Sequence, residues 1–135
     1  MSFAEQYVEV LDNCDLNHSE IAERDGREFV EFGMIAKDTK IKVMAIFEEN
    51  IVSNRIWGVC KVPEDKLAEV LFACNEFNQE YKFTKFVIDS DYEVTLQNDA
   101  ILEGESGGQE AFDLVASMIR IVDETYPKLM KVIWS

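Results

Sequence analysis

The segment Gly104-Glu105-Ser106-Gly107-Gly108 has the G-x-S-x-G spacing that can hold a nucleophilic serine on a sharp turn between a strand and a helix. Such a serine needs a histidine as its base, and in that kind of hydrolase the histidine follows the serine in the chain. The single histidine, His18, precedes Ser106. The sequence therefore favours a flexible turn that starts the last helix over a hydrolase site.

The same glycines raise a second possibility, because the unpaired N–H groups at a helix N-terminus can cradle a phosphate. No lysine follows in the position that a P-loop requires. Three carboxylates, Glu103, Glu105 and Glu110, also surround the segment with negative charge. Phosphate binding is therefore disfavoured here.

Asp89, Asp91 and Glu93 alternate as the first three ligands of a calcium loop do. The rest of that pattern fails, because Val94 stands where the sharp turn needs glycine and Ala100 where a bidentate glutamate is needed. A hairpin turn with solvated acids is the expected structure.

Cys14, Cys60 and Cys74 form an odd set without a C-x-x-C pair, so neither a disulfide framework nor a zinc site is expected. Reduced thiols in the cytoplasm are the simplest interpretation. His18 lacks neighbouring Cys or His partners and is expected to be a solvated loop residue. No cofactor, metal site or catalytic residue is predicted.

The composition limits the partners of the chain. With 135 residues, 47% of them hydrophobic, a single domain over residues 1–135 is expected. The formal charge of −14 disfavours nucleic acid and anionic membrane surfaces. The N-terminus lacks a basic region followed by an apolar run, so neither a leader nor a membrane anchor is expected.

The spacing of apolar residues predicts the elements of the first half. A helix over residues 2–13, capped by Ser2, is followed by a polar connector with at most one further helical turn near Ile21. From Arg27 onward, apolar residues recur at every second position, as they do in strands. This alternation predicts three strands joined as an antiparallel meander, over residues 27–36, 41–47 and 51–62.

In the second half, Pro63 begins a helix whose apolar stripe runs from Leu67 to Tyr81. A second hairpin is predicted over residues 83–88 and 92–96, and a long helix over 109–126. These elements form an α+β fold in the order α-β-β-β-α-β-β-α, with helices on one face of the sheet. The core is expected over residues 27–126, followed by an apolar C-terminal tail over residues 127–135.

The last helix is more apolar than one sheet face requires. One stripe contains Phe112 and Val122, and a second, about 100° around the helix, contains Leu114, Met118 and Ile121. The second stripe is predicted to be covered by the first helix or offered to a protein partner or a second copy. The predicted contact surface comprises Leu114, Met118, Ile121, Trp57 and Trp134.

The order of elements resembles the YbjN-domain family and, more broadly, the type III secretion chaperone-like fold. The resemblance covers roughly residues 27–126, and is carried by the helix over 67–78, which runs into Tyr81-Lys82-Phe83, and by Phe86-Val87-Ile88-Asp89-Ser90-Asp91 leading to Val94-Thr95-Leu96. It implies a non-enzymatic α+β domain, often dimeric, with a sensory, regulatory or chaperone-like role. Tyr92 departs from the family, which often has glycine at that turn position. No catalytic residues carry over.

The expected function is therefore a cytoplasmic, non-enzymatic interaction module, either a chaperone-like protein or a regulatory adaptor, that forms a homodimer. The alternative is a small-ligand-binding sensory domain in which Phe29, Phe47 and Trp57 line an apolar pocket on the sheet. An enzyme of unrecognised type is the third possibility.

Overall fold

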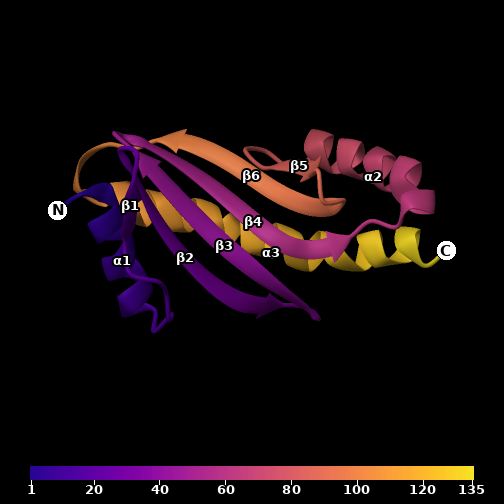
Figure 1. Cartoon of the computed structure of the whole chain (residues 1–135), viewed down its shortest axis with the longest axis horizontal. Helices are drawn as coiled ribbons and strands as arrows, with labels where there is room; N and C mark the ends of the chain where they lie inside the picture. The colour runs from indigo at the N-terminus through magenta and orange to yellow at the C-terminus, as the bar shows by residue number, and fades with distance from the viewer.

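The fold is an antiparallel sheet with three α-helices on one side (Figure 1). The computed structural model describes all 135 residues. The six strands lie in the order β1-β2-β3-β4-β6-β5, and every neighbouring pair is antiparallel. The predicted α+β class and the packing of helices against one face are confirmed.

Helix α1 (Phe3–Asn13) begins at a capping box. The backbone N–H of Glu5 donates to Ser2 Oγ at 3.1 Å, and the N–H of Ser2 donates to Glu5 Oε1 at 2.8 Å. Hydrogen bonding of the Ser2 backbone N–H, followed by that of the Ser2 side chain, to the Glu5 carboxyl lowers the pKa of that carboxyl. The predicted N-terminal helix and its cap are therefore confirmed.

Three long strands form the predicted meander, and their boundaries lie close to those predicted from the alternation of apolar and polar residues. They are β2 (Arg27–Ala36), β3 (Thr39–Glu48) and β4 (Ile51–Lys61). A short strand that the sequence did not predict, β1 (Ala22–Arg24), pairs with the beginning of β2. All three residues of β1 are exposed, so no alternation of apolar and polar residues marks it.

After a 3₁₀ turn, η1 (Glu64–Lys66), helix α2 (Leu67–Glu80) packs against β5 (Lys85–Ile88). The rings of Phe77 and Phe86 lie 4.9 Å apart. Strand β6 (Glu93–Ile101) is longer than predicted and pairs with β5 on one side and β4 on the other. A second 3₁₀ turn, η2 (Gly104–Ser106), leads into the last helix.

Helix α3 (Gly107–Ile133) continues through Pro127 and includes most of the predicted tail. A proline inside a helix costs about 3 kcal/mol, because it removes one hydrogen bond and crowds the preceding turn. Leu129 and Ile133, which lie beyond it, are 0% and 8% exposed. Burying two such side chains contributes about 3–6 kcal/mol, which offsets the cost of the proline.

Candidate functional site

One side of the sheet faces away from the helices and has no helix over it, and this side is turned toward the viewer in Figure 1. Successive strand residues point to opposite sides. Val30, Val43 and Ile56 face the helices and are fully buried. The residues of opposite parity form what we call the outer face: Phe29, Glu31, Gly33, Ile35, Lys40, Lys42, Met44, Ile46, Ser53, Arg55, Trp57, Gln97 and Asp99.

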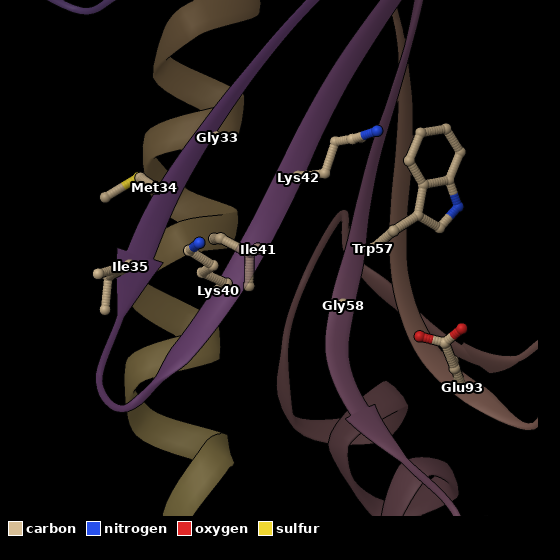
Figure 2. A pocket seen from close by; sticks show the side chains of 9 residues that line it. All are labelled: Gly33, Met34, Ile35, Lys40, Ile41, Lys42, Trp57, Gly58 and Glu93. Atoms are coloured by element: carbon tan, nitrogen blue, oxygen red, sulfur yellow. The ribbon is translucent and has the colours of Figure 1, made fainter.

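A groove of about 650 Å³ lies on this outer face, and we call it the Trp57 groove. Its middle is a row of residues that are register partners on three strands, namely Gly33, Lys42 and Trp57. Figure 2 shows the Trp57 side chain on β4, Lys42 on the neighbouring β3 and Ile35 at the outer margin of β2. Because Gly33 carries no side chain, the groove is open toward the edge of the sheet.

An irregularity in β4 borders the groove, since Gly58 lies in it and lines the groove. The regular pairing of β4 with β6 is interrupted between Ile56 and Cys60. Gly58 lies in this interruption with a φ of +83°, and a Cβ built on it would lie 2.7 Å from the carbonyl oxygen of Lys40. On the other side of β4, the hydroxyl of Thr39 on β3 donates to the carbonyl oxygens of Gly58 and Val59, at 2.9 and 3.1 Å. Such bulges bend a strand and re-aim its side chains.

The charge of the groove differs from that of the whole chain. Lys40 and Lys42 line it together with a single carboxylate, Glu93, whereas the chain has a formal charge of −14. Lys42 Nζ also lies 3.9 Å from a carboxylate oxygen of Glu31 on β2, and both side chains are largely exposed. The groove therefore combines apolar side chains with two lysines and two nearby carboxylates, which suits a partner that has both apolar and charged groups.

Two residues of the predicted contact surface are not on the surface. Met118 is 0% exposed and Ile121 is 6% exposed, so both belong to the core of this chain, and Leu114 is half-buried. Of the two alternatives predicted for this stripe, cover by helices of the same chain holds, because α1 and α2 both pack against α3, and Met118 and Ile121 cannot belong to a contact surface. Trp134 is 81% exposed, at the end of α3.

The aromatic residues expected to line a ligand pocket do not share one. Phe47 faces the helices, is 3% exposed, and its ring lies 5.4 Å from that of Tyr7 on α1. Phe29 lies on the outer face beside the guanidinium of Arg24, and it lines a smaller hollow of about 360 Å³. Of the three, Trp57 alone lines the larger groove.

Ser106 and His18 have separate partners. The Ser106 hydroxyl donates to Glu110 Oε1 at 3.0 Å, within the first turn of α3. His18 Nε2 lies 2.7 Å from Asp12 Oδ1, and its Nδ1 lies 2.6 Å from the carbonyl oxygen of Ser19. His18 is therefore not the hydrogen-bond partner of this serine, whose hydroxyl is held by Glu110 instead.

Both ring nitrogens of His18 face acceptors, which favours the doubly protonated imidazolium. The carbonyl of Ser19, followed by the carboxylate of Asp12, raises the pKa of His18 above its usual value. Ser19 in turn holds the edge of β2, because its N–H donates to the carbonyl of Glu31 at 2.8 Å and its Oγ accepts from the N–H of Glu31 at 3.0 Å. Protonation of His18 thus stabilises the connector between α1 and β2.

We expect His18→Gln to reduce stability more at pH 5.5 than at pH 8.5. Because the pKa of His18 is higher in the folded chain than in the unfolded chain, protonation of His18 stabilises the fold. This stabilisation is fully present below the pKa of the unfolded chain, about 6.5, and is lost as the pH rises through the pKa of the folded chain. Urea unfolding of both proteins at the two pH values measures this difference. An equal loss at both pH values would contradict a charged His18.

The remaining candidate groups have structural roles. Asp89 Oδ1 accepts hydrogen bonds from the N–H groups of Asp91 and Glu93, at 2.9 and 3.0 Å, and Oδ2 accepts from the Thr95 hydroxyl. Asp89 therefore organises the predicted hairpin turn. Burial raises the pKa of the Cys60 thiol to about 12 and that of Cys74 to about 11, so both thiols stay protonated at neutral pH.

Sequence reasoning identified Trp57 but missed the residues around it, chiefly Gly33, Lys42 and Gly58. Gly58 carries a signal, because a glycine inside an otherwise apolar strand often marks a bulge or a close backbone approach. The alignment of Gly33 and Lys42 with Trp57 depends on the register of three strands, which no local pattern shows.

The comparisons with known proteins add a family. The model of the YbjN family, described as "Putative bacterial sensory transduction regulator", matches residues 8–130. A search of curated proteins finds no match. None of the helices combines the length and the apolar composition that crossing a membrane requires.

Proposed function

Because the chain belongs to the YbjN family, we propose that it is a regulatory adaptor that acts by binding proteins, as a homodimer and without catalysis. The observation that carries this proposal is the outer face of the sheet with its Trp57 groove. The groove sets apolar side chains, among them Ile35 and Trp57, beside charged ones, and exposed apolar groups with a polar rim mark protein-binding sites. A chaperone-like role, in which the face holds an extended partner chain, is a form of the same proposal.

The proposal assigns the central contact to Trp57. A tryptophan that is half-buried in a concave site beside cationic side chains has the properties of a binding hot spot. Trp134, the other tryptophan, is exposed at the end of α3, outside the residues that line the groove. The two tryptophans therefore form a matched pair for an experiment.

We expect Trp57→Ala to weaken the capture of a specific partner from an extract of the source cells by tenfold or more, as truncation of a hot-spot residue does. Trp134→Ala is the control and should leave capture within about twofold of the unmodified protein. Circular dichroism of each variant checks that the fold is intact. Capture that survives Trp57→Ala, or that is lost only with Trp134→Ala, would contradict the assignment.

A small-ligand sensor is a second candidate, which the volume of the groove favours. About 650 Å³ is within the range of small-molecule sites, and Lys40 and Lys42 suit an apolar ligand that carries an anionic group. Native mass spectrometry of protein purified from the source cells measures this directly. A bound species of a few hundred daltons that is lost with Trp57→Ala favours the sensor, and its absence favours the protein partner.

A further inference from the structure

One edge of the sheet has backbone groups that nothing in the chain pairs. The two-residue turn between β2 and β3 closes on the pair Ala36 and Thr39. In such a hairpin the closing pair is hydrogen-bonded, so the even-numbered residues of β2 bond to β3 and the odd-numbered residues point their N–H and C=O groups away. Both backbone groups of Glu31, an odd-numbered residue, bond to Ser19 and not to β3, which confirms that the odd-numbered residues of β2 point outward.

Most of the other outward groups along the two edges are covered, and the exception is the end of β6 beyond Gln97, where β5 stops. β1 pairs with Arg27 and Phe29, and Ser19 satisfies Glu31. At the opposite edge of the sheet, the Asn78 side chain bonds both backbone groups of Phe86, at 2.6 and 3.1 Å. Beyond Glu31, the backbone groups of Gly33 and Ile35 point outward with no strand paired to them, on the strand at the margin of the sheet in Figure 2.

We propose that this segment, residues 32–36 of β2, pairs with the same segment of a second copy of the chain in an antiparallel two-fold arrangement centred on Met34. The inference rests on the proposed homodimer and names its contact surface. With this centre, Gly33 lies opposite Ile35 of the second copy, and each such pair exchanges both of its N–H···O bonds. The unpaired segment ends at Glu31, which Ser19 covers. Residues 32–36 can therefore pair along their whole length with residues 32–36 of the second copy.

The side chains of the segment complement themselves under the same two-fold axis. Ile35 is 66% exposed, and in the pair its side chain lies beside Gly33 of the second copy, where no side chain competes for the space. It thereby enters the open end of the Trp57 groove of that copy. Beyond the paired segment, Lys37 in the turn of one copy approaches the end where Ser19 covers Glu31 of the other, so a cation lies near an anion at each end of the pair.

Sedimentation of the full chain over a range of concentrations tests the proposal. We expect a dimer whose dissociation constant rises about tenfold or more with Ile35→Lys, because the change places an additional cation near Lys40 and Lys42 of the second copy. Ile101→Lys is the matched control. Ile101 is 72% exposed and lies on β6, outside the residues of the groove, so its change should leave the constant within about twofold.

A cysteine at the two-fold axis tests the register. Two copies of residue 34 would have their Cα atoms about 4.5 Å apart, which a disulfide can bridge. In a Cys14→Ser background, which removes the exposed native thiol, we expect Met34→Cys to cross-link the dimer on mild oxidation and Ile101→Cys not to do so. A dimer that neither cross-links at residue 34 nor responds to Ile35→Lys would overturn this surface alone. A strict monomer would overturn both the surface and the dimer, while capture of a partner through Trp57 remains a separate measurement.

Discussion

Gly108→Ala is expected to destabilise the protein by about 2–3 kcal/mol, although alanine is the better helix former by about 1 kcal/mol. A Cβ at residue 108 would collide with the Gln6 Cβ and would lie 2.5 Å from its backbone carbonyl carbon and 2.6 Å from the backbone nitrogen of Tyr7. These are backbone atoms of α1, so the whole helix has to move. The N–H of Gly108 also donates to Gln6 Oε1 at 2.8 Å, a contact that the shift would break.

Gly107→Ala is the matched control for this prediction. Its new Cβ would meet the ring of Phe3, with one ring carbon at 2.5 Å, and a half-buried side chain can rotate away where a backbone cannot. We therefore expect a clearly smaller loss. Urea unfolding followed by circular dichroism measures both variants, and a Gly108→Ala protein as stable as the unmodified one would contradict the close crossing of α1 and α3.

Gly58→Ala is expected to cost more than 2 kcal/mol of unfolding free energy and to weaken binding at the Trp57 groove. Two effects add at this position. The φ of +83° costs an L residue about 1–2 kcal/mol, and the new Cβ would lie 2.7 Å from the carbonyl oxygen of Lys40. Relief of that contact pushes β3 and β4 apart and disturbs the hydrogen bonds from Thr39 that hold the interruption in β4.

Gly26→Ala separates these two effects. Gly26 has a similar φ of +78°, and a Cβ there would have no atom within 4 Å. Its substitution should therefore cost about 1 kcal/mol and leave the groove unchanged. Equal losses for Gly26→Ala and Gly58→Ala, measured by thermal unfolding, would show that the close approach to Lys40 has no energetic weight.

The strands of the meander could be predicted from the sequence because each has one buried side. The alternation over residues 27–36 follows directly from a sheet that is covered by helices on one face. β1 could not be found in this way, because its residues are exposed on both sides and it is held by pairing with β2. The extension of α3 beyond Pro127 was missed because the benefit of burying Leu129 depends on tertiary packing.

The candidate site was predicted only in part, for a related reason. Counting apolar faces on the last helix correctly found two buried sides, but it could not decide whether Met118 and Ile121 met another helix of the same chain or a partner. Trp57 was identified by residue type. The groove around it follows from the register that aligns Gly33 with Lys42 and from the interruption at Gly58, and both are long-range features.

The most direct test of the outer face as the contact surface is photocrosslinking in the source cells. The photoreactive residue p-benzoylphenylalanine would replace Met44, which lies on the outer face between Glu31 and Arg55, or Lys128, which is exposed on α3. We predict covalent adducts with another protein from position 44 and none from position 128. Adducts from position 128 alone, or none from position 44, would contradict the account.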